Sequence, residues 1–220
     1  MPSVYFTSRA QAGIEAVQHL LAPVSGKPAT VVSLTTDAVM VGLQVANYFQ
    51  CPLQLYLSDT ITLPGQIEIG GVNQDGGFSY SSDMEGGFQD YFYQEYHGYL
   101  EDAKRESFSS LNRELKSREV IRRDLLAKRA IIVVADCLPS PAPLDSFIDF
   151  AKSVNFERLI VCAPIAMAKD LSHLEKVSNE YYVPGKIDFF YGADHYFSDN
   201  TVVPRETAID SISNALKLWP

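Results

Sequence analysis

The sequence predicts an α/β fold in which a parallel sheet of four to five strands carries helices on both faces. Two observations support this fold class. Short apolar runs rich in β-branched residues recur along the chain, and the segments between them repeat their apolar residues with helical period. The first run, the next helix and the second run have the length of a strand–helix–strand unit, which sets its strands parallel.

The first 57 residues supply this unit and a helix before it. The helix at 8–21 can be capped by Ser8. A buried strand follows at 29–34, then a helix at 37–49 and a second strand from Cys51-Pro52 to Leu57. We expect the apolar residues of the two helices to face inward, namely Ile14, Val17, Leu20 and Leu21, then Val41, Val45, Tyr48 and Phe49.

Residues 60–120 have another pattern, which we interpret as a flap and a long helix inserted after the second strand. Glycine pairs punctuate 60–87, and Asn73–Gly77 can turn a hairpin between short antiparallel strands. Residues 88–118 predict a helix with an aromatic stripe at Phe88, Phe92, Tyr96 and Tyr99. The stripe either packs on the flap or on a second copy of the chain, or forms a platform for an aromatic ligand.

The remaining elements complete the sheet. Strands are expected at 131–136, 158–163 and 180–183, with helices at 144–154 and 166–178. An irregular aromatic segment then runs to Phe197, and a last helix spans 204–218 with Pro204 in its first turn. We predict one domain over residues 1–220, with 60–120 as its insertion.

Charge and cysteine content exclude several classes of function. The chain has 18 basic and 27 acidic residues, and a net charge of −9 argues against nucleic acid as a partner. Neither a membrane helix of ~20 apolar residues nor a signal peptide is evident. Cys51, Cys137 and Cys162 fit no metal or disulfide spacing, which suits a reducing compartment. We therefore expect a cytoplasmic protein with no metal site and no membrane partner, in which Cys137 is the thiol to test for reactivity.

The segment 131–144 outlines an anion site that lacks its donors. Four β-branched residues lead to Ala135-Asp136, and a helical pattern resumes at Leu144. In α/β proteins a strand, an acidic tip, a Gly/Thr-rich turn and a helix N-terminus form a cradle for anions. Here the turn has no glycine, and its three prolines, Pro139, Pro141 and Pro143, have no N–H to donate.

These motifs, in this order, resemble the type I phosphoribosyltransferase fold over roughly residues 6–212, and in particular a bacterial subfamily of predicted phosphoribosyltransferases. Leu34-Thr-Thr-Asp-Ala-Val-Met-Val41 stands where that subfamily has Leu-Pro-Arg-Gly-Gly-Val-Pro-Val. Ser58-Asp59 stands in place of a basic pair. Val134-Ala-Asp-Cys-Leu-Pro-Ser-Pro-Ala-Pro143 replaces the phosphoribosyl-diphosphate motif Val-Asp-Asp-Gly-x-Ala-Thr-Gly-Ala-Thr.

The resemblance implies where a ligand would bind and which groups have changed. In the family, the first two loops offer amide donors and cations to pyrophosphate, and two carboxylates hold the ribose hydroxyls, often with Mg²⁺. Here Asp37 and Asp59 place negative charge in those two loops, and Asp136 matches one of the two carboxylates. Ser140 matches the threonine that would bond the 5′-phosphate. The candidate ligand-binding residues are Thr35, Thr36, Asp136, Cys137 and Ser140.

Two hypotheses about function follow. The favoured one is a phosphoribosyltransferase-like protein that has lost transferase activity, needs no cofactor, and acts as a binding, regulatory or scaffold protein for an unknown small molecule or as a homo-oligomer. The alternative is a divergent active phosphoribosyltransferase that acts on phosphoribosyl diphosphate or a nucleotide. It would need Mg²⁺ and would use Asp136 as its catalytic residue.

Overall fold

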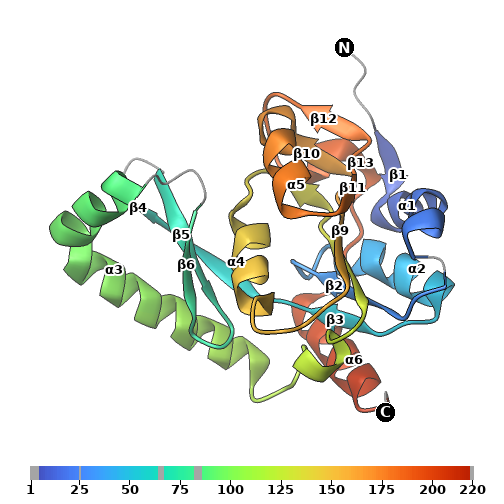
Figure 1. Ribbon diagram of the computed structural model, residues 1–220, viewed down its shortest axis with the longest axis horizontal. Helices are drawn as coiled ribbons and strands as arrows, with labels where there is room; N and C mark the ends of the chain where they lie inside the picture. Colours follow the sequence, from blue (N-terminus) through green and yellow to red (C-terminus); the bar gives the residue numbers. More distant parts are fainter. Residues whose placement is uncertain (1–4, 25, 64–66, 82–85, 219–220) are drawn as a thin grey trace. The chain divides into compact units, whose positions relative to one another are not determined.

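The computed structural model describes residues 5–24, 26–63, 67–81 and 86–218, and for 86–93 it describes the backbone alone. The chain forms two compact units (Figure 1). The first contains Met1–Leu55, Arg118–Ser140 and Val154–Pro220, and the second contains Tyr56–Ser117 and Pro141–Ser153. The predicted insertion at 60–120 falls mostly in the second unit, together with 141–153, which the sequence analysis did not group with it.

The first unit is built on a five-stranded parallel sheet flanked by helices, as predicted. Its strand order is β11-β9-β7-β2-β3, with bounds Glu180–Tyr182, Arg158–Cys162, Ala130–Val134, Ala29–Ser33 and Leu53–Leu55. The central strands β7 and β2 pair over their whole length, from Ala29 opposite Ala130 to Ser33 opposite Val134. Every residue of both strands is buried, which explains why the sequence shows them as continuous apolar runs.

Three neighbouring strands of this sheet break and then continue. They are followed by β8 (Cys137–Leu138), β10 (Ile165–Met167) and β12 (Gly185–Ile187), which pair in parallel in the matching order β12-β10-β8. The breaks contain Asp136, Pro164 and Pro184. Proline cannot donate to a ladder, so it interrupts two of the three strands.

This second sheet corrects two predictions. The chain does not enter an open turn after Asp136, because Cys137 and Leu138 pair with Ile165 and Ala166. The helix predicted at 166–178 is shorter, since β10 and a 3₁₀ turn precede α5 (Leu171–Val177). In both places a pairing partner distant in sequence decides the local structure, which propensity alone does not reveal.

Helices α1 (Arg9–Val24) and α2 (Val39–Phe49) pack on each other and on the sheet. Val17, Leu20, Val41 and Val45 are buried as predicted. The prediction is wrong for Ile14, Leu21 and Tyr48, which are exposed by 51%, 37% and 55%. The reason lies at Gly13, where a Cβ atom would stand 2.6 Å from the Val41 carbonyl oxygen, so α1 presents its small residues to α2 and turns Ile14 outward.

Two segments near the ends of the described chain lie side by side. Strand β1 (Phe6–Ser8) pairs in parallel with β13 (Phe197–Asp199), which begins where the segment predicted to be irregular ends. The Ser8 hydroxyl accepts the Gln11 N–H at 3.1 Å, which confirms the predicted cap of α1. The last helix, α6, spans Arg205–Leu216 and packs beside β3.

The second unit is the predicted flap with its long helix. Strands β4 (Ser58–Leu63), β5 (Ile67–Asn73) and β6 (Phe78–Tyr80) form an antiparallel sheet, and the Asn73 N–H donates to the Gly77 carbonyl at 2.9 Å in the expected hairpin. Helix α3 (Gly86–Leu115) is kinked at Tyr96, and α4 (Ala142–Ala151) packs on β5.

The aromatic stripe predicted on α3 is only partly visible. The side chains of Phe88 and Phe92 lie outside the described residues. Tyr96 and Tyr99 are exposed, and the Tyr99 hydroxyl donates to the Thr62 carbonyl oxygen at 2.9 Å. Within the described part of the chain, none of the helices combines the length and hydrophobicity needed to cross a membrane.

Candidate functional site

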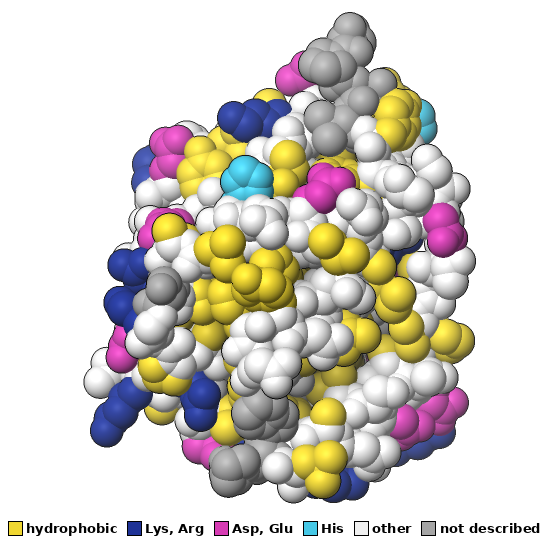
Figure 2. Space-filling model, turned by 90° about the vertical axis from the view of Figure 1, so that its right-hand side faces the viewer, with side chains coloured by type: hydrophobic (Ala, Val, Ile, Leu, Met, Phe, Trp, Pro, Cys, Tyr) yellow, Lys and Arg dark blue, Asp and Glu magenta, His cyan; other side chains and the backbone are white. Residues whose placement is uncertain are grey.

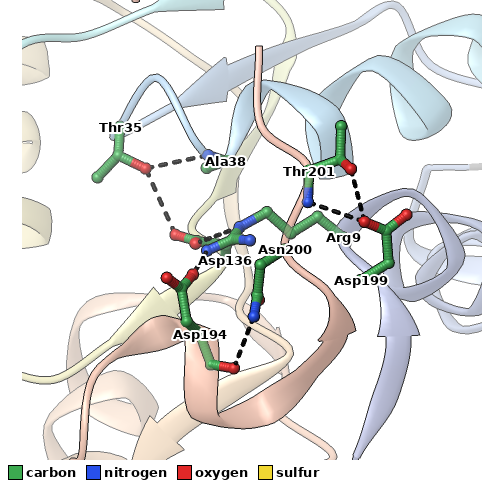
Figure 3. Close-up of polar contacts among 8 residues, drawn as sticks. All are labelled: Arg9, Thr35, Ala38, Asp136, Asp194, Asp199, Asn200 and Thr201. Carbon is green, nitrogen blue, oxygen red and sulfur yellow. Dashed lines mark hydrogen bonds and ion pairs between the residues drawn. The ribbon is translucent and has the colours of Figure 1, made fainter. Parts of the chain in front are cut away.

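A buried ion pair lies at the carboxyl end of β7, the central strand of the sheet (Figure 3). Arg9 begins α1, and its side chain is 1% exposed. Its Nε donates to Asp136 Oδ2 at 2.8 Å, and its Nη2 donates to Asp194 Oδ1 at 3.3 Å. The guanidinium also lies 4.7 Å from the centre of the Phe197 ring. The sequence analysis identified Asp136 but not Arg9, the residue that engages it.

The charge of Arg9 is maintained by its partners. Burial lowers the pKa of Arg9, but the hydrogen bond and negative charge of Asp136 outweigh that effect, so the pKa is raised. Arg9 Nη1 is buried and has no hydrogen-bond partner among the described residues. A buried pair of this kind stabilises the fold only while both members are present, because removing one leaves an uncompensated charge.

Thr35 links Asp136 to the N-terminus of α2. Its hydroxyl lies 3.4 Å from Asp136 Oδ1, as donor, and accepts the Ala38 N–H at 3.0 Å. The Val39 N–H donates to the Thr36 carbonyl oxygen at 3.2 Å. The Ala38 and Val39 amide groups at the start of α2 therefore have partners within the loop itself.

Asp37 adds a further carboxylate. Burial raises its pKa, and the charges of Asp136 and Asp194 raise it further, while Arg9 and Arg205 partly offset the effect. Two carboxylates thus bond one buried guanidinium, and the charge of a third, Asp37, acts on it. The excess of negative charge opposes the approach of an anionic ligand.

The structure brings Thr35 and Asp136 into contact, but it places the other predicted ligand-binding residues differently. Thr36 is buried, and Ser140 follows β8. The Cys137 side chain packs in an apolar cluster with Phe6 and Ile165 rather than beside Asp136. Burial raises the pKa of the Cys137 thiol, and it raises those of Cys51 and Cys162 to about 12, which argues against a reactive thiol at Cys137.

The donor set does not fit Mg²⁺. Each oxygen of Asp136 already has a partner, Arg9 on one side and Thr35 on the other. Over the residues that the structure describes, no group of three or more His, Cys, Asp or Glu side chains could hold a metal ion. His195 lies 3.5 Å from the Tyr5 hydroxyl on the surface.

Arg9 and Asp194 were missed by the sequence analysis, although one signal pointed to Arg9. The buried face of α1 consists of Arg9, Ala12, Gly13, Ala16, Val17, Leu20 and Val24. A charged residue on the same buried face of a helix needs a buried partner of opposite charge. Asp194 had no such signal, because it lies in a 3₁₀ turn whose position depends on the pairing of β13 with β1.

No family model matches the chain, and no curated protein matches it either. The solved structure of TT1426 from Thermus thermophilus is similar, with 17% identity, 96% of this chain and 99% of that chain covered, and a TM-score of 0.75. A purine phosphoribosyltransferase from Pyrococcus horikoshii matches with 9% identity, coverage of 86% and 91%, and a TM-score of 0.45. A hypoxanthine-guanine phosphoribosyltransferase from Bacillus anthracis matches with 11% identity, coverage of 83% and 79%, and a TM-score of 0.45.

The likeness to TT1426 concerns the fold alone. It extends over nearly the whole of both chains. The five-stranded parallel sheet with its flanking helices confirms the predicted α/β fold class.

Proposed function

We propose that this phosphoribosyltransferase-like protein has no transferase activity and serves as a binding or regulatory protein. The observation that carries the proposal is the state of Asp136. A carboxylate that holds ribose hydroxyls must be accessible, whereas the Asp136 side chain is 6% exposed and paired with Arg9 at 2.8 Å. Binding a ribose there would require breaking a buried ion pair, which is unfavourable by several kcal/mol.

Two further features support the proposal. The backbone of Cys137 and Leu138, which would have to approach a phosphate, is engaged in the ladder with β10. In the first loop, Thr35 accepts the Ala38 N–H, and Asp37 contributes negative charge. A ligand at Thr35, Thr36, Asp136, Cys137 and Ser140 would therefore be uncharged or cationic rather than a diphosphate.

The test is the transferase reaction itself. The purified protein, phosphoribosyl diphosphate, Mg²⁺ and a panel of purine and pyrimidine bases should release no more pyrophosphate than a heat-denatured sample. Titration calorimetry with phosphoribosyl diphosphate, with and without Mg²⁺, should be silent. Pyrophosphate release that Asp136→Asn abolishes and Asp188→Asn leaves unchanged would overturn the proposal, since Asp188 is an exposed acid of the same unit.

A second candidate function, a divergent active transferase, is favoured by the position of Asp136 and by one weak contact. Ligands of open α/β sheets bind at the carboxyl ends of the strands, where Asp136 lies. The Asp194 side chain is 74% exposed and only 3.3 Å from Arg9, so a ligand can compete for this donor. Under this function, calorimetry would show Mg²⁺-dependent binding of phosphoribosyl diphosphate that Asp136→Asn removes.

A further inference from the structure

The second unit contains a groove between strand β4 and helix α3, which packs beside that strand (Figure 1). Its volume is about 320 Å³. Four consecutive residues of β4, at positions 59–62, line one side, and α3 lines the other with one helical face from Tyr99 to Arg113. Because consecutive strand residues line it, the groove follows the strand and reaches its backbone as well as its side chains. We call it the β4/α3 groove.

Strand β4 turns unpaired backbone groups toward this groove. Among the described strands, β4 pairs with β5 alone. The Leu57 N–H and carbonyl both bond to Gln74, on the side of β5. Backbone direction alternates along a strand, so the N–H and C=O groups of Thr60 and Thr62 point away from β5. The Thr62 carbonyl agrees with this, since it accepts the Tyr99 hydroxyl of α3 at 2.9 Å. Thr60 therefore offers one donor and one acceptor to the groove.

The sequence of β4 leaves this edge open to another strand. Edge strands of natural proteins are commonly protected by Pro or Lys, which hinder pairing with a further chain. The strand Ser58-Asp-Thr-Ile-Thr-Leu63 has neither, and three of its six residues are β-branched. An extended peptide is the occupant that satisfies the outward N–H and C=O groups of such a strand in register.

Two carboxylates at the groove have no partner of their own. On α3, the nearby acid Glu101 is neutralised by Lys104 at 2.9 Å. Within the part of the chain that the structure describes, the side chains of Asp59 and Glu106 have neither an ion pair nor a hydrogen bond. Arg113 is the cation of the lining, so the groove has an excess of negative charge. An occupant with basic side chains matches that excess.

The same charge argues against other occupants. A second copy would bring another acidic groove and another net charge of −9 to this edge, and the two would repel each other. The surface of α1 and α2 is a poorer place for a basic segment, because hydrophobic and neutral side chains occupy its centre and most charged ones lie toward its margin (Figure 2). The β4/α3 groove combines unpaired carboxylates with an open strand edge.

We propose that the β4/α3 groove binds an extended basic segment of a partner protein, which adds to β4 as a further strand and sets Lys or Arg side chains against Asp59 and Glu106. The backbone of Thr60 supplies ladder hydrogen bonds, and the carboxylates select the basic sequence. Every residue of this site belongs to the second unit. The proposal is therefore independent of whether the candidate site at Asp136 is active.

Fluorescence anisotropy with labelled seven-residue peptides tests the proposal on the full chain. A peptide of alternating Lys and Val should bind with a dissociation constant below ~1 mM, and a peptide of alternating Glu and Val should bind at least about 10-fold more weakly. Methylation of the backbone nitrogens of the Lys/Val peptide should also weaken binding at least about 10-fold, because it removes the ladder donors. Hydrogen exchange should show protection of the Thr60 amide by the unmodified peptide.

Matched variants locate the site. The double variant Asp59→Asn, Glu106→Gln should weaken binding of the Lys/Val peptide by about 5- to 10-fold. The double variant Glu95→Gln, Asp102→Asn removes the same charge from exposed positions of α3 outside the groove and should leave binding unchanged. All four residues are exposed, so circular dichroism should show the wild-type fold.

Three results would each overturn the proposal. The first is that the Lys/Val peptide does not bind below ~1 mM. The second is that both double variants weaken its binding equally, which would mean general attraction to an acidic protein. The third is that the methylated peptide binds as well as the unmodified one, which would mean that no strand is added to β4.

Discussion

Two regions of the first unit differ in their charged residues: one buries paired charges and the other exposes almost none. At the carboxyl end of β7, Arg9 and Asp136 are buried and hold each other, with Asp37 and Asp194 nearby. On the outer surface of helices α1 and α2, the exposed positions of α2 have no charge. Helix α1 belongs to both regions, because it begins with the buried Arg9 and exposes Ile14 little more than one turn later.

The difference separates two ways in which a surface meets other molecules. A buried ion network satisfied from within stabilises one arrangement, and a ligand must replace its bonds before it can bind. An uncharged surface loses no ion hydration when it is covered, so association costs less there. The region that resembles an active site is therefore the more closed of the two.

The largest effect is expected from removing Arg9. Arg9→Met should lower the free energy of unfolding by about 3–5 kcal/mol, because it leaves Asp136 buried without its counter-charge. Urea denaturation measures this loss. The double variant Arg9→Met, Asp136→Leu should recover most of it, since no unpaired charge then remains.

Lys27→Met is the control for Arg9. Lys27 pairs with Glu157 at 4.0 Å, both side chains are 42% exposed, and a loss of no more than about 1 kcal/mol is expected. A loss for Arg9→Met as small as that for Lys27→Met would show that the buried Arg9–Asp136 pair contributes no more to stability than an exposed ion pair.

A smaller loss is expected at the close contact between α1 and α2. Gly13→Ala should destabilise the fold by about 1–3 kcal/mol, because the new Cβ atom would lie 2.6 Å from the Val41 carbonyl oxygen and α1 must shift. Thermal unfolding measures the change.

Gly98→Ala is the matched glycine in a helix. A Cβ atom there would have nothing within 4 Å, so this change should stabilise α3 by up to about 1 kcal/mol. Equal and favourable effects of both substitutions would mean that α1 and α2 do not depend on close backbone approach.

The sequence predicted the sheet well for a physical reason. Strands β2 and β7 are buried on both faces, so their sequences are continuous apolar runs, which predict buried strands. Strand β8 escaped prediction because two residues, Cys137 and Leu138, are too few to show a period. Their conformation depends on pairing with β10.

The site was predicted in part. Thr35 and Asp136 came from motifs at the ends of strands, and parallel strands bring such ends together. No motif identified Arg9, because it lies 127 residues before Asp136 and a polar residue at the start of a helix is common. The outward positions of Ile14 and Tyr48 were missed because an apolar residue in a helix does not reveal whether it faces a core or a partner.

The smallest effect is expected at Asp37, and it depends on pH. Its raised pKa means that the folded state binds the proton more tightly than the unfolded state, whose pKa is near 3.8. The contribution of Asp37 to stability is therefore highest below pH 3.8 and decreases as the pH rises through the folded pKa. Asp37→Asn removes this penalty, so it should stabilise the protein at neutral pH and have little effect near pH 3.

Asp199→Asn should show the opposite trend. The side-chain hydroxyl and backbone N–H of Thr201 lower the pKa of Asp199, so its carboxylate contributes stability above the unfolded pKa. The variant should be less stable than the wild type at neutral pH and close to it in acid, as urea midpoints at several pH values would show. If the stability of Asp37→Asn changed with pH in the same way as that of Asp199→Asn, the negative charge of Asp37 would stabilise the folded protein. The candidate site would then oppose anions less than its three carboxylates indicate.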